Sequence, residues 1–190
     1  MNIALVITAA GNSVRFGADK LSYAVNGKPM LAYALELYAS LAECFCTRIV
    51  VLQPQRSQQI ALAQALGFSA VYNDAPQLGI SHSVVLGTLA ALKCDPDGVL
   101  YAVGDQPNMQ ANTVLSLLAA FSRQPDSIVA PCAAGKRGNP VLFPRALLHE
   151  LTTLTGDVGG SAVIKRHPQL LKTVPVSSRE LIDIDTNSEG

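Results

Sequence analysis

Apolar segments with the character of buried strands alternate with helical segments along most of this chain, and this order constrains the fold more than any other feature. We expect strands over Ile3–Ile7, Arg48–Leu52, Ala70–Tyr72, Val99–Val103 and Ser127–Ala130. We expect helices over Met30–Ala42, Gln55–Leu66, Ser83–Leu92 and Asn112–Ser122. Strands that are apolar throughout and separated by helices are typical of a parallel sheet covered on both faces. The order therefore predicts a three-layer α/β fold with a mostly parallel central sheet.

After Pro131 the regular alternation of expected strands and helices ends. Gly135–Phe143 reads as a turn that leads into a short strand, Arg145–Leu151 as a helix, and Gly156–Gly160 as a glycine-rich turn. No linker, repeat or low-complexity segment separates these parts, and 190 residues suit one domain with a substantial core. We expect a single domain, residues 1–190.

The composition excludes several classes of partner. Hydrophobic residues make up 49% of the chain, charged residues 15%, and the formal net charge is zero. Such a balance gives no electrostatic reason to bind a nucleic-acid backbone or an acidic membrane surface. The first apolar run is short and lacks a basic leader, and no later run is long enough to span a bilayer. We expect a cytoplasmic protein with no nucleic-acid and no membrane partner.

The cysteines carry no sign of a metal site. Cys44, Cys46, Cys94 and Cys132, together with three histidines, do not form a spacing typical of metal ligands. Reduced thiols are the usual state in the cytoplasm. We therefore expect four reduced, mostly buried thiols.

The loop that follows the first expected strand has the composition of a phosphate-binding loop. Gly11 lets backbone N–H groups approach phosphates closely, and Arg15 and Lys20 can meet their negative charge. A Walker A loop needs glycine where this chain has Phe16, and Ser13 interrupts a dinucleotide-binding fingerprint. The loop is therefore a phosphate loop of a third kind; solvated loop cations are the alternative.

An acidic side chain follows another expected strand at the edge where open α/β sheets bind ligands. Asp105 follows Val99–Val103 after a single glycine, Gly104, and Pro107 stiffens the turn beyond it. Magnesium uses one or two carboxylates together with substrate phosphates, so Asp105 is a candidate ligand of Mg²⁺. An Asx turn or a helix cap is the alternative.

Two further segments allow both a binding and a structural interpretation. Ser81 and Ser83 can cap a helix or meet a ligand at its start, and His82 lacks a nucleophile partner, which argues against a hydrolase triad. Asp183 and Asp185 would face opposite ways in a strand, so that one could reach the site. Solubilising charges near the chain end are the alternative.

These segments together resemble one family, the small nucleotidyltransferases of molybdenum-cofactor biosynthesis, or MobA-like NTP transferases. The resemblance is carried, in order, by Thr8-Ala-Ala-Gly11-x-Ser13-x-Arg15-Phe-Gly17-x-x-Lys20, Gly27-Lys-Pro29, Leu78-Gly-Ile-Ser81-x-Ser83, Gly104-Asp105-Gln-Pro107, Arg137-Gly-Asn-Pro140-Val-Leu-Phe143, Gly156-Asp157-x-Gly159 and Asp183-Ile-Asp185-Thr186. The cytidylyltransferase branch is the most similar, because the guanylyltransferases tend to have Gly-Gly where this chain has Ala10-Gly11.

The resemblance implies a Rossmann-like nucleotidyltransferase fold and an Mg²⁺-dependent reaction. CMP would pass from CTP to the terminal phosphate of molybdopterin with release of pyrophosphate, and a molybdoenzyme would be a transient contact. The acceptor phosphate is already anionic at neutral pH, so the enzyme has to screen charge and align the attack, and no general base is required.

The resemblance also assigns roles to residues at matching positions. Arg15, Lys20 and Asp105 would be catalytic, and Asp105 and Asp185 would bind the metal. The nucleotide would contact Ala9, Ala10, Gly11, Ser13, Arg15, Lys20, Gly79 and Ser81. Asn139 and Asp157 would line the acceptor side.

The chain departs from the family pattern at three places, and the second of these bears on the acceptor. Thr8 stands where leucine is usual, Gly160-Ser161 replaces Ala-Arg, and Asn187 replaces a common proline. The second change removes a cation that could contact the acceptor. The open alternatives are another phosphorylated acceptor such as a sugar phosphate, GTP in place of CTP, and a non-catalytic accessory protein that binds nucleotide or cofactor for a molybdoenzyme.

Overall fold

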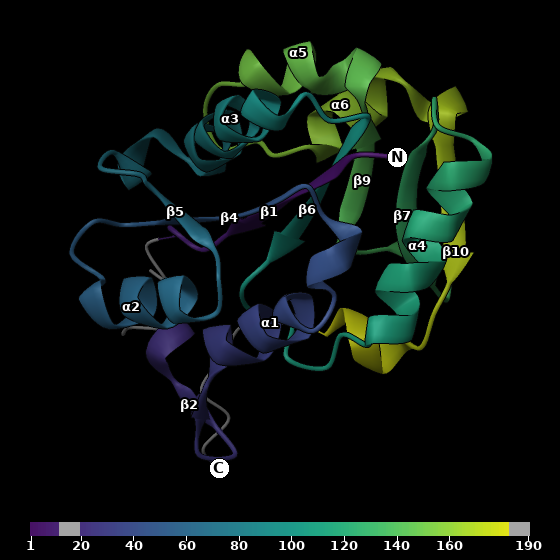
Figure 1. Cartoon of the computed structure of the whole chain (residues 1–190). Helices are drawn as coiled ribbons and strands as arrows, with labels where there is room; N and C mark the ends of the chain where they lie inside the picture. Colours follow the sequence, from purple (N-terminus) through teal and green to yellow (C-terminus); the bar gives the residue numbers. More distant parts are fainter. Residues whose placement is uncertain (12–19, 183–190) are drawn as a thin grey trace.

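A mixed sheet of eight strands forms the centre of the protein (Figure 1). The computed structural model describes residues 1–11 and 20–182. The strands run in the order β10-β7-β9-β6-β1-β4-β5, and β8 pairs with β7 beside this path. Their bounds are β1 (Ile3–Thr8), β4 (Thr47–Leu52), β5 (Ser69–Tyr72), β6 (Gly98–Val103), β7 (Ile128–Ala133), β8 (Lys136–Arg137), β9 (Val141–Pro144) and β10 (Leu171–Pro175).

The sheet is mostly parallel, which confirms the expected fold class. β5, β4, β1 and β6 are parallel neighbours, and β10 is parallel to β7. β9 is antiparallel to both β6 and β7 and lies between them. A separate hairpin of β2 (Ala24–Val25) and β3 (Lys28–Pro29) turns at Asn26 and Gly27, both with positive φ, as tight hairpins require.

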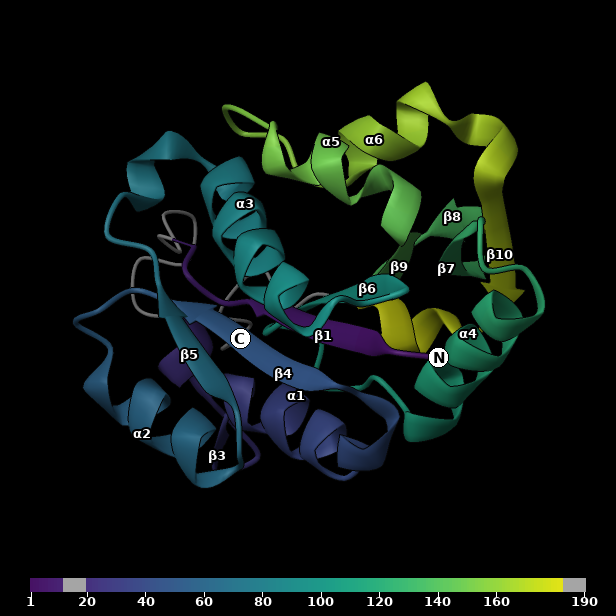
Figure 2. The same ribbon diagram turned by 45° about the horizontal axis from the view of Figure 1, so that its top comes forward.

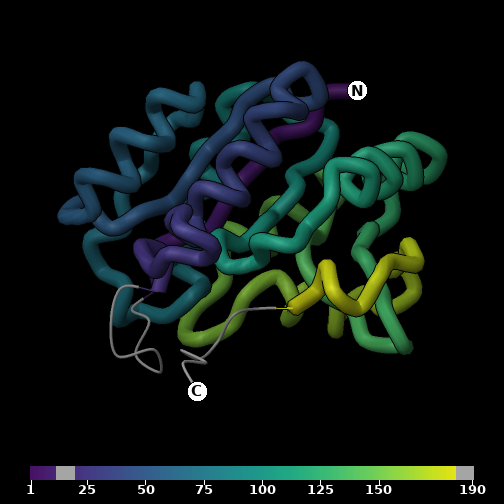
Figure 3. Tube along the Cα trace, turned by 90° about the horizontal axis from the view of Figure 1, so that it is seen from below, coloured from purple at the N-terminus to yellow at the C-terminus, as the bar shows by residue number. Residues whose placement is uncertain are grey.

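Helices cover both faces of the sheet. One layer holds α1 (Met30–Ala39), α2 (Ser57–Ala65) and α4 (Ala111–Arg123), and the other holds α3 (Ile80–Ala91), α5 (Leu148–Thr152) and α6 (Ser161–Arg166). Figure 2 shows α3 lying over β1 and β4. Figure 3 shows α1 and α2 side by side on the opposite face.

The two cores follow from the alternation of side chains along each strand. In β1, the side chains of Ile3, Leu5 and Ile7 pack in the core with α1, α2 and α4. Ala4 and Val6 pack in the other core, with residues of α3, α5 and α6. A strand buried on both faces reads as a continuous apolar run, and for that reason β1 was visible in the sequence.

Differences from the expected elements lie mainly at their ends and in the last third of the chain. The expected helix over Met30–Ala42 ends at Ala39, and a 3₁₀ turn follows over Ala42–Cys44. α3 begins at Ile80, three residues before the expected start, because Gly79 with φ of +89° supplies the entry. The strand β10 and the six-residue helix α6 were not predicted, since β10 is a half-exposed edge strand and α6 is too short for a periodic pattern.

The expectation of four reduced thiols is wrong for one pair. Cys46, just before β4, and Cys94, which ends a 3₁₀ turn before β6, form a disulfide with their Cα atoms 6.6 Å apart. Cys44 and Cys132 are free and half-buried. The two bonded cysteines stand 48 positions apart in the chain, so no local spacing indicates the pairing.

The carboxyl end of β1 lies at the point where the connections change direction. The chain passes from β1 to β4 on one side and later returns to β6 on the other, with Thr8 opposite Val51 and Val103. Open α/β sheets bind ligands in the crevice at such a switch point. No helix among residues 1–11 and 20–182 is long and apolar enough to cross a membrane.

Candidate functional site

The opening loop leaves β1 at this switch point, as the sequence predicted. The Ala9 amide donates to the carbonyl of Val51 at 2.9 Å, so the loop starts as a continuation of the sheet. Ala9 and Ala10 are buried, whereas Gly11 is exposed. Ser13 and Arg15 lie outside the described residues, and their assigned roles remain predictions.

Two side chains from the β4–α2 connection hold the carbonyl groups of this loop. Arg56 donates from Nη1 to the Ala9 carbonyl at 2.9 Å and from Nη2 to the Gly11 carbonyl at 2.8 Å. Gln53 donates from Nε2 to the Ala10 carbonyl at 2.9 Å. The sequence reasoning missed both residues, although Gln53 directly follows an expected strand at the edge of the sheet where ligands bind.

Lys20 and Asp105 meet at the same edge. Lys20 begins a 3₁₀ turn after the opening loop, Asp105 follows β6, and Lys20 Nζ lies 2.8 Å from Asp105 Oδ2. The side chains retain 11% and 26% of their accessible surface, so the pair is partly shielded from water but can be reached by a ligand. The structure thus brings together a cation and a carboxylate that stand 85 residues apart in the chain.

The donor chemistry at this edge fits a hard divalent cation. The carboxylate of Asp105 is partly exposed beside a loop suited to phosphates, and Mg²⁺ takes one or two carboxylates plus phosphate oxygens. Asp185, the expected second ligand, lies outside the described residues. Within the described part of the chain, no three His, Cys, Asp or Glu side chains cluster as a complete protein-only metal site.

Gly79 and Ser81 lie at the start of α3. A Cβ atom on Gly79 would come within 2.5 Å of the Gly156 carbonyl oxygen, so this position requires glycine for packing as well as for its positive φ. The amide of Ser81 donates to the same carbonyl at 3.4 Å, and Ser81 is buried. His82 Nδ1 lies 2.8 Å from Asn73 Oδ1, a contact with no nucleophile in it.

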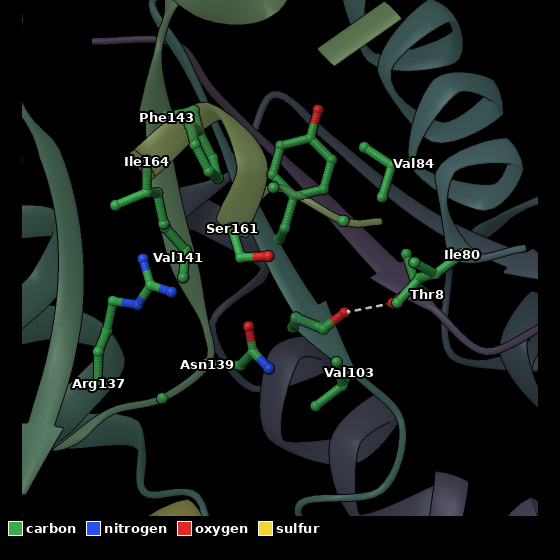
Figure 4. Close-up of a pocket in the computed structure, with 15 residues that line it drawn as sticks. Thr8, Ile80, Val84, Val103, Arg137, Asn139, Val141, Phe143, Ser161 and Ile164 are labelled. Atoms are coloured by element: carbon green, nitrogen blue, oxygen red, sulfur yellow. Dashed lines mark hydrogen bonds between the residues drawn. The ribbon is translucent and has the colours of Figure 1, made fainter. Parts of the chain in front are cut away.

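A pocket of about 260 Å³ opens between α3, β6, β9 and α6 (Figure 4). Its apolar walls come from Ile80, Val84, Tyr101, Val141, Phe143 and Ile164. The Tyr101 and Phe143 rings pack edge to face with centroids 5.7 Å apart. Tyr101 shares a 2.6 Å hydrogen bond with Thr88, and burial raises the pKa of the Tyr101 phenol far above its ordinary value, so Tyr101 is neutral.

Polar groups line the other side of the pocket. Figure 4 shows the Arg137 guanidinium, the Asn139 amide and the Ser161 hydroxyl around one end of the space. Thr8 adds a hydroxyl that donates to the Ala102 carbonyl at 3.3 Å. Desolvation lowers the pKa of Arg137 from its ordinary value, but a guanidinium stays charged at neutral pH. The pocket therefore offers a cation and hydrogen-bonding groups next to an apolar surface.

The two residues assigned to the acceptor side occupy different places. Asn139 lines the pocket together with Arg137. Arg137 belongs to a motif that carries the family resemblance, but no binding role was predicted for it. Asp157 does not line this pocket; it is exposed, and its Oδ1 accepts from the Ile80 amide at 3.4 Å, at the start of α3. Asp157 thus satisfies a helix terminus in this structure.

The switch point thus combines a loop suited to phosphates, a lysine and a carboxylate, and a separate pocket lies beside it. These are the parts of a nucleotidyltransferase. This class is borne out by the comparison with known families. Residues 5–171 match the model of the MobA-like NTP transferase domain, and the chain belongs to that family.

Individual relatives are more distant. The bifunctional protein GlmU of Mycobacterium bovis (strain BCG / Pasteur 1173P2) is 34% identical in an alignment 126 residues long, which covers 61% of this chain and 24% of GlmU. The chain thus spans about a quarter of the length of such curated relatives.

Solved structures extend the likeness of fold over almost the whole chain. Rv0371c from Mycobacterium tuberculosis H37Rv has a TM-score of 0.83 and 24% identity, over 98% of this chain and 93% of that one. The manganese complex of Rv0371c has a TM-score of 0.78, 23% identity and coverage of 98% and 95%. CMP:2-keto-3-deoxy-manno-octonic acid synthetase with CTP has a TM-score of 0.75, 17% identity and coverage of 98% and 94%.

Proposed function

We propose that this protein is an Mg²⁺-dependent cytidylyltransferase that transfers CMP from CTP to the terminal phosphate of molybdopterin and releases pyrophosphate. The observation that carries the proposal is that the Lys20–Asp105 pair lies at the edge of the sheet where β1 and β6 end, and that the last residues of these strands, Thr8 and Val103, line the pocket that also holds Arg137. This arrangement has one side suited to a triphosphate and another suited to a phosphorylated acceptor. We further propose that the reaction takes place in the cytoplasm and that the product passes to a molybdoenzyme.

The choice of CTP rests on two supports. The sequence Ala10-Gly11 is similar to that of the cytidylyltransferase branch, and the synthetase of similar fold was solved with CTP. The choice of a divalent metal rests on Asp105 and on the manganese complex of Rv0371c. When bound, Mg²⁺ would neutralise charge on the triphosphate and the departing pyrophosphate, with Asp105 and Asp185 holding it.

The residues of this chain then have defined tasks. Arg15 and the backbone of Gly11 would hold the triphosphate, and Lys20 would neutralise the α-phosphate. Ala9, Ser13, Gly79 and Ser81 complete the proposed nucleotide contacts. An oxygen of the acceptor phosphate would attack the α-phosphorus of CTP. The bond between the α-phosphorus and the oxygen that bridges it to the β-phosphorus would break, and pyrophosphate would leave. No proton has to be moved, because the attacking phosphate is already ionised.

On the acceptor side, Asn139 and Arg137 would orient the attacking phosphate. The apolar walls of the pocket would receive the remainder of the acceptor and keep water from the attack line. Gly160-Ser161, where the family has Ala-Arg, favours a second candidate function, transfer of the nucleotide to a different phosphorylated acceptor. Asp157 does not line this pocket, but it accepts from the amide of Ile80, which does, and we propose that it contacts the acceptor at the start of α3.

The test measures pyrophosphate release with CTP, GTP or ATP, Mg²⁺ and molybdopterin. We expect turnover with CTP, and a loss of at least a hundredfold in Lys20→Ala and Asp105→Ala. Lys93→Ala and Asp95→Ala are matched controls, since these residues precede β6 at its amino end, whereas Asp105 follows its carboxyl end. Turnover unchanged by Lys20→Ala or Asp105→Ala would contradict the mechanism. Tight nucleotide binding without turnover would favour the accessory role.

A further inference from the structure

Three successive carbonyl groups of the opening loop are held from one side. The acceptors are the carbonyl oxygens of Ala9, Ala10 and Gly11, and the donors are Arg56 for the first and third and Gln53 for the second, all at 2.8–2.9 Å. Hydrogen bonds from a charged donor at this distance are among the stronger ones in proteins. The two Nη atoms of the Arg56 guanidinium reach the first and the third carbonyl, and Gln53 reaches the one between them.

The two holding side chains are themselves fixed. Gln53 is buried, and its Oε1 accepts from Gln55 Nε2 at 2.6 Å, so its amide can present only Nε2 to Ala10. The amide of Arg56 donates to the Gln53 carbonyl at 3.1 Å, which closes the turn that carries both residues. The donors are therefore set in place by the β4–α2 connection before any ligand is bound.

Fixing a carbonyl also fixes the N–H group of the same peptide. In a trans peptide the two point in opposite directions, so holding the Ala9 carbonyl aims the Ala10 amide to the other side, and holding the Ala10 carbonyl aims the Gly11 amide. Neither amide donates a hydrogen bond to any group in residues 1–11 and 20–182. Apart from Gly11 and its chain neighbours, no atom of residues 1–11 and 20–182 lies within 4 Å of the place where a Cβ of Gly11 would stand, and Gly11 is exposed.

We propose that Gln53 and Arg56 are positioning residues for triphosphate binding, which hold the peptide planes of the opening loop so that the Ala10 and Gly11 amides face the phosphates. The inference rests on the proposed binding of a nucleoside triphosphate and adds to it the residues that orient the loop. A rotated peptide would turn a carbonyl dipole toward the anion, and the guanidinium on the carbonyl side makes the opposite N–H groups stronger donors.

The experiment measures the dissociation constants of CTP and of tripolyphosphate, a probe with no base, by calorimetry. Gln53→Met removes the donor without changing the charge, and Arg56→Met removes the fork. We expect each variant to weaken both ligands about tenfold, with Arg56→Lys between Arg56→Met and the unsubstituted protein. Equal effects on the two ligands would locate the change at the phosphates.

Arg48→Met is the matched control. Arg48 also donates from Nη1 to a loop carbonyl, that of Leu66 at 3.1 Å, and covers the Phe68 ring, but it lies in β4 away from the opening loop. We expect its dissociation constants to stay within twofold of those of the unsubstituted protein. Binding by Gln53→Met within twofold of normal, or binding by Arg48→Met weakened as much as by Arg56→Met, would overturn the inference.

Failure of the inference can be told from failure of the proposed function. A protein that binds CTP and loses that binding in Gln53→Met, but transfers nothing to molybdopterin, supports the positioning role and contradicts the proposed reaction. An unsubstituted protein that binds neither CTP nor tripolyphosphate contradicts both. Circular dichroism of each variant checks that it folds, and Gln53→Ser replaces Gln53→Met if the longer apolar side chain prevents folding.

Discussion

Arg137 places a positive charge beside a pocket whose other walls are largely apolar. It stands on β8 and directly precedes the segment that carries Asn139, so both residues reach the pocket from one short stretch of chain. A guanidinium binds a phosphate through two parallel hydrogen bonds, which gives direction as well as charge. We expect this side chain to select a phosphorylated acceptor.

Arg137→Ala is therefore expected to raise the KM for the acceptor about tenfold and to leave the KM for CTP within twofold. Steady-state kinetics with one substrate varied at a time separates the two constants. Arg145→Ala serves as a matched control, because Arg145 pairs with Asp95 before β6 and does not line the pocket. A change in the KM for CTP as large as that for the acceptor would place Arg137 on the nucleotide side instead.

At the scale of elements, α3 lies unusually close to the sheet. A Cβ on Gly87 would lie 2.4 Å from a methyl carbon of Val6 and 3.2 Å from one of Val51. The helix can approach β1 and β4 to this distance only because Gly87 has no side chain. The same helix carries Ile80 and Val84 to the pocket, so its height above the sheet also sets one wall of the site.

Gly87→Ala is expected to destabilise the protein by about 1–3 kcal/mol, because overpacking outweighs the roughly 1 kcal/mol by which alanine favours a helix. Denaturant unfolding measures the change. The displaced wall should also raise the KM for the acceptor. Leu89→Ala, on an exposed part of α3, is the control and should change stability by less than about 0.5 kcal/mol. A more stable Gly87→Ala protein would show that the helix is free to move outward.

The ion pairs that connect α5 with the end of α6 are sensitive to pH. Glu150 in α5 accepts from Arg166 Nε at 2.8 Å and lies 2.5 Å from His167 Nε2, which joins α5 to the end of α6. Burial disfavours the charged carboxylate, but the hydrogen bonds from His167 and Arg166 outweigh it, so the pKa of Glu150 lies below its ordinary value. A lowered pKa of a carboxyl stabilises the fold above its unfolded-state pKa of about 4.3, and this stability is lost as the pH falls through the folded value.

Glu150→Gln should lower the free energy of unfolding by about 1 kcal/mol at pH 7, a modest figure because the pair is partly exposed to solvent. The difference from the unsubstituted protein should shrink as the pH falls below about 4.3. Thermal unfolding between pH 3 and 7 measures both. Glu36→Gln, which removes the more exposed pair with Lys28, is the matched control. A difference that stays constant down to pH 3 would rule out the carboxylate as its source.

At the scale of the whole molecule, one sheet passes through both halves of the site, so binding at the switch point should stabilise the entire domain. A ligand at a hundred times its dissociation constant adds about 2.7 kcal/mol to the free energy of unfolding. For a chain of this size that corresponds to a rise in Tm of roughly 5–10 °C. We expect this rise with CTP and Mg²⁺, a much smaller rise after chelation of the metal, and a single unfolding transition in calorimetry.

An equal rise with and without the metal would contradict the proposed role of Asp105. Asp105→Asn is the matched variant, because it keeps the size of the side chain and removes its charge. We expect this variant to bind CTP with little dependence on Mg²⁺. Two separate transitions would instead show that the halves of the sheet unfold independently.

The parts of the fold that could be predicted are those whose residues are buried on both sides. β1 and β6 are apolar and buried along almost their whole length, β4 is so from Ile49 on, and each was expected within one or two residues of its observed bounds. β10 lies at an edge and exposes most of its side chains, so its sequence resembles that of a loop. The Cys46–Cys94 pair depends on two connections meeting at the amino edge of the sheet, which no local pattern encodes.

The residues of the candidate site also differ in how far the sequence alone could predict them. Lys20 and Asp105 could be selected because each directly follows a recognisable glycine turn or strand. Gln53 and Arg56 bind backbone carbonyls rather than a ligand, and a glutamine and an arginine near a strand end form no motif. Arg137 and Asn139 could be quoted from a motif, but that they share a pocket with Ser161 depends on how β9 and α6 pack.

The antiparallel direction of β9 has a consequence for how a protein of this kind can change. Because β9 runs against β6, the residues that precede it arrive at the same edge as the residues that follow β1 and β6. One continuous stretch, from β8 to α6, thus furnishes Arg137, Asn139 and Ser161, while Lys20 and Asp105, proposed for the nucleotide side, lie in earlier parts of the chain. With the proposed roles, we expect mutations confined to that stretch to alter which acceptor is taken and to leave the chemistry at the phosphates untouched, so that acceptor preference can diverge between descendants of one ancestral enzyme.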